Sequence, residues 1–152
     1  MLKLFLGAAM ADFEDTSGDD VLTGTTDTDL FRVINGGDDG VSALGGDDII
    51  YFGRGSGSNS FTAADSVDGG TGTDTAVFSG VQSDYSVLEV DGKLVVVDLN
   101  AADGNDGADI LASVEVLQFK DGTVPASPPA IVALDSGPSA PSNDAVDAAS
   151  MI

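Results

Sequence analysis

The chain contains no cysteine, no histidine and no tryptophan, and only five of its 152 residues are basic. Without cysteine it has no disulfide framework and no thiol chemistry. Without histidine or cysteine, triad hydrolysis and ordinary zinc sites lose their usual participants. The sequence also lacks any stretch of about twenty apolar residues that could span a bilayer as a helix. These absences argue against the commonest hydrolytic and zinc chemistries.

Positive charge is scarce as well. The formal net charge at pH 7 is −21, and the basic residues are Lys3, Arg32, Arg54, Lys93 and Lys120. Binding to nucleic acid depends on basic residues that neutralise phosphates, so this composition rules against a nucleic-acid partner. The same charge disfavours adsorption to an anionic membrane surface.

Aspartate is present in excess. It supplies all but three of the 26 acidic residues, whereas a need for solubility alone would use glutamate as freely. A pair of carboxylates could cleave a glycoside. These aspartates, however, form a repeated series rather than two singular residues, and aromatic platforms for a sugar are scarce. We therefore expect a protein that is not an enzyme.

One short phrase recurs along the first half of the chain: glycine, any residue, aspartate, any residue, apolar residue. Four clear copies and two looser ones begin at Gly18, Asp27, Gly37, Gly46, Gly57 and Gly72. Their starts lie 9, 10, 9, 11 and 15 residues apart, which indicates a period of nine with insertions. A unit this small cannot bury its own apolar residue, so the units are predicted to stack as turns of a solenoid.

Stacking would bring like charges together. Nine residues make one turn and one strand, so units two apart lie on the same edge, about 4.8 Å from one another. Asp20 would lie over Asp39, and Asp29 over Asp48. Two such charges repel by about 3 kcal/mol at an effective dielectric of 20. A hard dication that takes carboxylate and carbonyl oxygens would relieve this repulsion, and calcium suits it better than magnesium, which demands a smaller octahedral cage.

The units resemble the Gly-Gly-x-Gly-x-Asp-x-apolar-x nonapeptides of RTX (repeats-in-toxin, hemolysin-type) calcium-binding proteins. The best match spans residues 69–77, and residues 45–50 carry the second half of the motif. Residues 74–80, 83–85 and 114–123 resemble a module often found downstream of such repeats. Together the resemblance covers about residues 16–124.

The resemblance implies an all-β fold: a short, irregular parallel β-roll, then a β-hairpin or sheet that caps it, then an extended C-terminal tail. It also implies about two to four calcium ions. The implied ligands at the motif position are Asp20, Asp29, Asp39, Asp48 and Asp74. The implied auxiliary ligands are Asp19, Asp38 and Asp47, and Asn59 offers only a neutral oxygen.

Some positions depart from the pattern. Asp27 replaces the turn glycine in the second copy, and Asn59 replaces the aspartate in the fifth. Same-edge partners lie 19, 20 or 26 residues apart instead of 18, so bulges or loops must absorb the excess. A plainer interpretation also stands: glycine-aspartate phrases make ordinary hairpin turns. The recurrence of aspartate at one phase of the unit favours calcium.

Four segments are expected. Residues 1–15 are an apolar segment, either a clipped signal peptide or, as we prefer, a cap or partner contact. Residues 16–80 hold the repeats and residues 81–124 the downstream β module. Residues 125–152 are rich in proline, alanine, serine and aspartate and form a weakly ordered tail.

Within the downstream module, a hairpin is predicted from Tyr85 to Leu99 around the turn Asp91-Gly92. The segment from Asn100 to Asp109 is predicted as a plain loop. An alternative is that Asp103, Asp106 and Asp109 in this loop hold another ion. Strands follow between Ile110 and Phe119.

In RTX proteins an uncleaved C-terminal signal directs type I secretion, and the tail is compatible with that. We therefore expect a secreted calcium-binding protein, extracellular or on the cell surface, whose folding is coupled to calcium. Three roles stay open: a structural or assembly subunit, a carbohydrate-binding module, or a detached C-terminal domain of a secreted hydrolase. The short length favours the first, with self-association through the exposed ends of the roll.

Overall fold

The computed structural model describes residues 10–53, 64–100, 102 and 104–126. In these ranges the chain forms twelve strands and one 3-10 turn, Gln82–Asp84, and no α-helix. The predicted all-β class is confirmed. The C-terminal tail from residue 127, and residues 1–9 of the apolar segment, lie outside the described residues. Within the described ranges, no helix has the length and hydrophobicity needed to traverse a bilayer.

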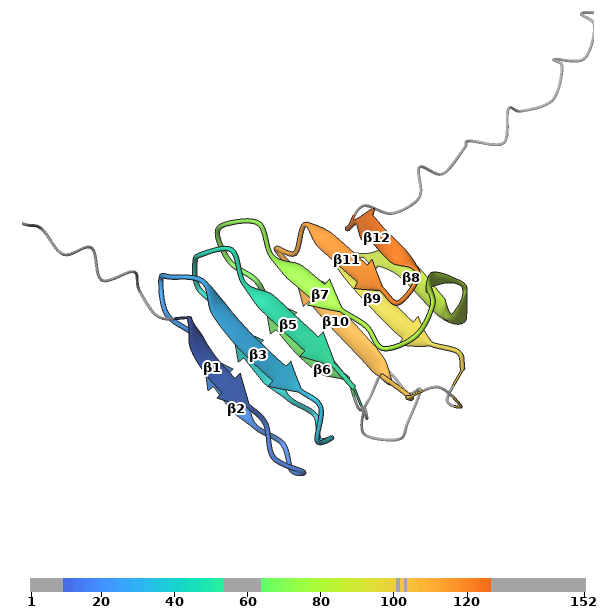
Figure 1. The fold of residues 1–152 in the computed structure, drawn as a ribbon, viewed down its shortest axis with the longest axis horizontal. Coiled ribbons are helices and arrows are strands. Elements are labelled where there is room, and N and C mark those ends of the chain that lie inside the picture. Colours follow the sequence, from blue (N-terminus) through green and yellow to red (C-terminus); the bar gives the residue numbers. More distant parts are fainter. Residues whose placement is uncertain (1–9, 54–63, 101, 103, 127–152) are drawn as a thin grey trace, which may run out of the picture.

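The strands form two six-stranded sheets (Figure 1). Sheet A contains, in spatial order, β1 (Ala11–Glu14), β3 (Asp29–Val33), β5 (Ile49–Phe52), β7 (Thr75–Val77), β11 (Val116–Phe119) and β12 (Gly122–Pro125). Sheet B contains β2 (Val21–Thr23), β4 (Gly40–Ser42), β6 (Asp65–Asp68), β10 (Ala108–Ala112), β9 (Lys93–Asp98) and β8 (Tyr85–Val90).

From β1 to β7 the chain alternates between the two sheets, and each strand pairs in parallel with the strand two before it. This is the predicted β-roll. Its core lies between the sheets, where alternate residues of each short strand point inward. The inward rows are Phe13, Phe31, Ile50, Ala76 and Leu117 in sheet A, and Leu22, Val41, Val67, Leu111 and Leu94 in sheet B.

Glycine recurs in the turns because neighbouring coils touch there. Gly72 has φ +138°, and a Cβ at that position would lie 1.9 Å from the carbonyl oxygen of Gly46. Gly46 has φ +118° and stacks in turn on Asp27. Asp27 belongs to the first such turn, where its own backbone does not adopt a positive φ. This explains why the second copy tolerates aspartate in place of glycine.

The predicted hairpin is confirmed as β8 and β9 in antiparallel register. Asp91 and Gly92 have φ of 52° and 77°, which is the backbone of a two-residue type I′ turn. β9 pairs with β10, so the hairpin covers the edge that β10 would otherwise expose. β10 itself pairs in parallel with β6, and β11 with β7. The hairpin is therefore an insertion between two successive coils of one roll.

Candidate metal-binding site

Two columns of carboxylates run across the roll, one at each turning edge. The B column stands where the strands of sheet B begin and contains Asp20, Asp39, Asp65 and Asp109. The A column stands where the strands of sheet A begin and contains Asp29, Asp48, Asp74 and Glu115. Each column follows the direction in which neighbouring strands pair, so the stacking of coils alone brings its members together.

Backbone hydrogen bonds connect successive members of each column. In the B column the N–H of Asp20 donates to Oδ1 of Asp39 at 2.8 Å, and the N–H of Asp39 donates to Oδ1 of Asp65 at 2.8 Å. The A column repeats this arrangement. The N–H of Asp29 donates to Oδ1 of Asp48 at 2.7 Å, and the N–H of Asp48 donates to Oδ1 of Asp74 at 2.9 Å. Each of these carboxylates thus uses one oxygen to hold the preceding coil.

The second oxygen of three carboxylates has no such partner. The atom is Oδ2 in Asp39, Asp48 and Asp74, residues that are at most 2% exposed. In each of them Oδ2 accepts no hydrogen bond, although it is buried. A buried acceptor without a partner costs about 1–3 kcal/mol, and more when it is charged. Three such atoms, one in the B column and two in successive coils of the A column, indicate a recurring ligand rather than a local defect.

Two further unpaired oxygens lie at the start of β10, one in the strand and one in the loop that leads into it. Oδ1 of Asp109 and Oδ1 of Asn105 are buried without a hydrogen-bond partner. Asn105 lies four residues before Asp109, and its φ of 52° gives the loop a tight left-handed turn. Asp109 is the register partner of Asp65. The last step of the B column therefore also presents oxygen atoms that lack a donor.

The electrostatics of the columns disfavour the charged state. Burial, with a smaller contribution from neighbouring carboxylates, raises the pKa of Asp39 and of Asp48 above the usual aspartate value. The same causes raise the pKa of Asp65 and of Asp74 to about 6. Burial raises the pKa of Asp109 furthest. These shifts follow from burial, and no basic side chain of the described residues appears among their causes.

The described basic side chains lie elsewhere. Among the described residues the one ion pair joins Arg32 to Asp12, on the outer face of sheet A. Also within the described ranges, no three acidic side chains converge on one point. A cation in the columns would therefore take carboxylates singly or in pairs and complete its shell with carbonyls of the turns, an oxygen set that suits calcium.

The first coil differs from the others. Oδ2 of Asp20 accepts the backbone N–H and the hydroxyl of Thr16, and Oδ2 of Asp29 accepts both from Thr25. The hydrogen bonds from Thr16 lower the pKa of Asp20. A threonine four residues before the aspartate thus satisfies the first carboxylate of each column.

The sequence correctly paired Asp20 with Asp39 and Asp29 with Asp48. The predicted auxiliary aspartates Asp19, Asp38 and Asp47 are exposed on the turns. Asp19 accepts the N–H of Asp38, and Asp47 accepts the N–H of Thr73, so two of them connect neighbouring turns. Asn59 lies outside the described residues, and Asp65 occupies the B-column place after Asp39.

Sequence reasoning missed Asp65 and Glu115, and it named Asp109 only within an alternative ion site of the loop from Asn100 to Asp109. One signal was available: residues 104–112 read Gly-Asn-Asp-Gly-Ala-Asp-Ile-Leu-Ala, a nonapeptide with asparagine in place of its second glycine. The predicted plain loop was wrong at its end, because Asp109 belongs to β10. Asp106 accepts hydrogen bonds from Ser79 and Tyr85 and so anchors the loop, while Asp103 lies outside the described residues.

The fold resembles a solved structure, that of the extracellular lipase LipA from Serratia marcescens. The superposition has a TM-score of 0.51 and 22% sequence identity, and it covers 68% of this chain. It covers 14% of the lipase chain, so this chain spans a small part of that protein's length. At this identity the likeness concerns the fold alone. No protein-family model and no curated protein sequence matches the chain.

Proposed function

We propose that this chain is a calcium-binding β-roll whose folding depends on calcium. The unpaired Oδ2 atoms of Asp39, Asp48 and Asp74 carry this proposal. Each is a buried carboxylate oxygen without a hydrogen-bond donor, one in the B column and two in the A column. Calcium accepts six to eight oxygen ligands in flexible geometry, so it suits turns whose spacing varies from coil to coil.

These three residues would each supply a carboxylate oxygen, and Asp109 with Asn105 would supply oxygens at the last step of the B column. This set agrees with two to four ions. Asp20 and Asp29 would end the columns, because their carboxylates already accept donors from threonine. The exposed Asp19, Asp38 and Asp47 would raise the local concentration of cations without closing a site.

Charge repulsion would keep the calcium-free chain open, and the millimolar calcium outside cells would close the turns. The RTX resemblance and the fold shared with an extracellular lipase support a secreted, extracellular protein. The resemblance also supports type I secretion through the segment from residue 125 onwards. We assign the chain a non-enzymatic role as a structural or assembly subunit.

A second candidate role is that of a detached C-terminal domain of a secreted hydrolase. The lipase match favours this role because it covers only 14% of the lipase chain, so the likeness is to one small region of a larger enzyme. A catalytic domain encoded in the same reading frame would decide for it. A carbohydrate-binding role has less support. Among the described residues, Tyr51 is the one exposed aromatic side chain available to stack on a sugar.

Circular dichroism with and without chelator tests the proposal. We expect the β spectrum to be lost in chelator and restored by millimolar calcium, but not by equal magnesium. Asp48→Ala should lower the number of bound ions measured by calorimetry, whereas Asp47→Ala on the exposed side of the same turn should not. A β spectrum that is indifferent to chelator would overturn the calcium assignment.

A further inference from the structure

Among the described residues the two sheets end in four edge strands, and one of them carries none of the usual protections. β1 carries the acids Asp12 and Glu14, β12 ends in Pro125, and β2 is only three residues long. Charge, proline and shortness are the usual means by which edge strands avoid pairing with another chain. β8 has six residues, and its single charge is Glu89. It is therefore the edge best suited to accept another strand.

The backbone of β8 directs free hydrogen-bonding groups outward. The two-residue turn makes Val90 and Lys93 a hydrogen-bonded pair, and such pairs alternate along an antiparallel ladder. Ser86 and Leu88 therefore also bond to β9, and the N–H groups of Tyr85, Val87 and Glu89 point away from it. Tyr85 donates to the carbonyl of Gln82, which leaves Val87 and Glu89 as outward donors.

The side chains beside this edge are apolar on the outer face of sheet B. Leu88 is 52% exposed and Val90 is 51% exposed. Leu88 lies in register with Val95, which is followed across the sheet by Ile110. Further along the same row the residues become Ser66 and Gly40, so the apolar character is confined to the part of the sheet next to β8.

We propose that β8 pairs with β8 of a second copy of this chain, antiparallel and centred on Leu88. In this register Val87 faces Glu89 of the other copy, Ser86 faces Val90, and the two Leu88 side chains meet on the twofold axis. Val87 and Glu89 exchange both backbone hydrogen bonds on each side of the axis. All four outward N–H groups of the pair are then satisfied, and sheet B continues through both copies.

This register also avoids opposing charges of the same sign. Glu89 meets valine rather than glutamate, Asp91 meets Tyr85, and Asp84 meets Gly92. Like charges directly across a strand pair destabilise it, so the one acid of β8 is placed where it costs least.

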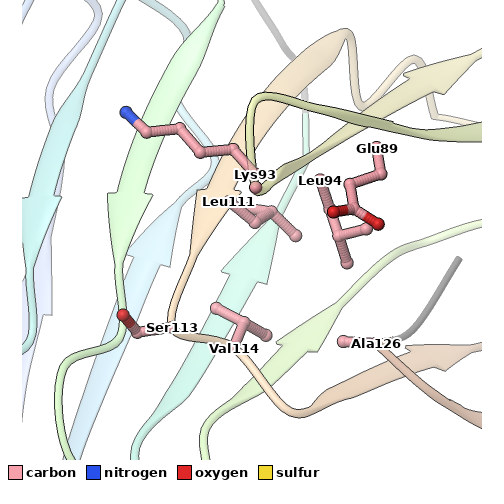
Figure 2. Close-up of a pocket in the computed structure, with 8 residues that line it drawn as sticks. Glu89, Lys93, Leu94, Leu111, Ser113, Val114 and Ala126 are labelled. Carbon is pink, nitrogen blue, oxygen red and sulfur yellow. The ribbon is translucent and has the colours of Figure 1, made fainter.

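A small pocket receives the second strand. It has a volume of ≈ 210 Å³ and lies between the hairpin and the turn that leads into β11. Figure 2 shows Glu89 and Leu94 on the hairpin side and Val114 and Ala126 on the opposite side. Val87 of the second copy, placed opposite Glu89 on the inner face, lies at the rim of this pocket.

Net charge sets how the association responds to salt. Each copy has a formal net charge of −21, so two copies repel at long range. At about 0.15 M ionic strength this repulsion is screened beyond roughly 8 Å, whereas the strand contact is not weakened. Added sodium chloride should therefore strengthen the dimer, the opposite of its effect on an interface made by ion pairs.

Sedimentation equilibrium of the full chain in calcium at two salt concentrations tests the proposal. We expect a monomer–dimer equilibrium that shifts toward dimer with salt. Leu88→Lys places two ammonium groups on the twofold axis and should weaken the dimer at least tenfold. Glu89→Pro should weaken the dimer as much, because it removes an outward N–H that the β8–β9 ladder does not use. Val21→Lys changes a residue that is 85% exposed on the first strand of the same sheet, and this control should leave the dimer intact.

Three results would overturn this dimer. The protein could stay monomeric up to about 1 mM, the weakest affinity of interest here. In a second such result, Leu88→Lys would associate as strongly as the unaltered chain. In a third, deletion of residues 1–9 would abolish association while Leu88→Lys retained it, and the contact would then lie at the N-terminal end. The proposal does not rest on calcium at any atom of β8. Circular dichroism of each variant in the same buffer reports folding separately, so a failed calcium assignment and a failed dimer are distinguishable.

Discussion

Replacing Asp74 with asparagine is expected to stabilise the calcium-free protein and to destabilise the calcium-bound one. Oδ1 of Asp74 accepts the N–H of Asp48 at 2.9 Å, and asparagine keeps that acceptor. Oδ2 is buried without a partner, and in asparagine an uncharged amide nitrogen takes its place. The substitution therefore removes the charge and spares the hydrogen bond that holds the neighbouring coil.

The expected size of the effect follows from the carboxylate's environment. Burial raises the pKa of Asp74 from 3.8 to about 6, which corresponds to at most about 3 kcal/mol of unfavourable ionisation in the folded state at neutral pH. Water reaches the turns, so we expect a gain of roughly 1–2 kcal/mol without calcium. With calcium, loss of a charged ligand should weaken binding at least tenfold, a loss of about 1.4 kcal/mol or more.

Thermal unfolding monitored by circular dichroism, with sucrose present to populate the folded state, measures both effects at pH 7. The matched control is Asp47→Asn, on the exposed side of the adjacent turn, where Oδ1 accepts the N–H of Thr73. That change should have little effect in either buffer. If Asp74→Asn changed stability by the same amount in chelator and in calcium, the charge of the carboxylate would contribute nothing through calcium, and the cation argument would be refuted.

Three further outcomes are expected. Because the pKa values of Asp65 and Asp74 are raised to about 6, the stability they contribute in chelator is complete below 3.8 and is lost as the pH rises through about 6. With sucrose present to populate the folded state, urea unfolding in chelator should therefore show a more stable protein at pH 4 than at pH 7. Gly72→Ala should cost about 3 kcal/mol or more, because its Cβ would meet the Gly46 carbonyl oxygen at 1.9 Å. By comparison, Gly92→Ala, with open space at its Cβ, should cost about 1 kcal/mol in the same urea assay. Thr25→Val removes the hydroxyl that donates to Asp29 and should cost about 1 kcal/mol without changing the calorimetric number of bound ions, since that carboxylate ends its column.

The sequence predicted well wherever a contact joins units at the regular spacing. Asp20 with Asp39 and Asp29 with Asp48 are 19 residues apart and were paired correctly, because stacked repeats contact only their neighbours. The hairpin at Asp91 and Gly92 was also predicted, since its turn chemistry is local.

Prediction failed for Asp65, although Asp74, which also follows its column partner Asp48 by 26 residues, was placed at the motif position. Asp65 follows Asp39 by 26 residues, so the phrase that contains Asn59 took its place in the sequence argument. Asp109 is separated from Asp65 by the whole β8–β9 hairpin, and which strand receives β10 is decided by tertiary pairing. Glu115 was missed because the last coil changes the acid and shortens the turn, although its carboxylate still accepts the N–H of Asp74 at 2.9 Å.

A crystal structure of the protein grown with calcium tests the central claim most directly. We predict ion density with calcium-like anomalous signal beside Oδ2 of Asp39, Asp48 and Asp74, each ion completing its shell with carbonyl oxygens of the turns. If these oxygens instead had no ion beside them and contacted only water, in a roll that keeps the same strand register in millimolar calcium, the central claim would be contradicted.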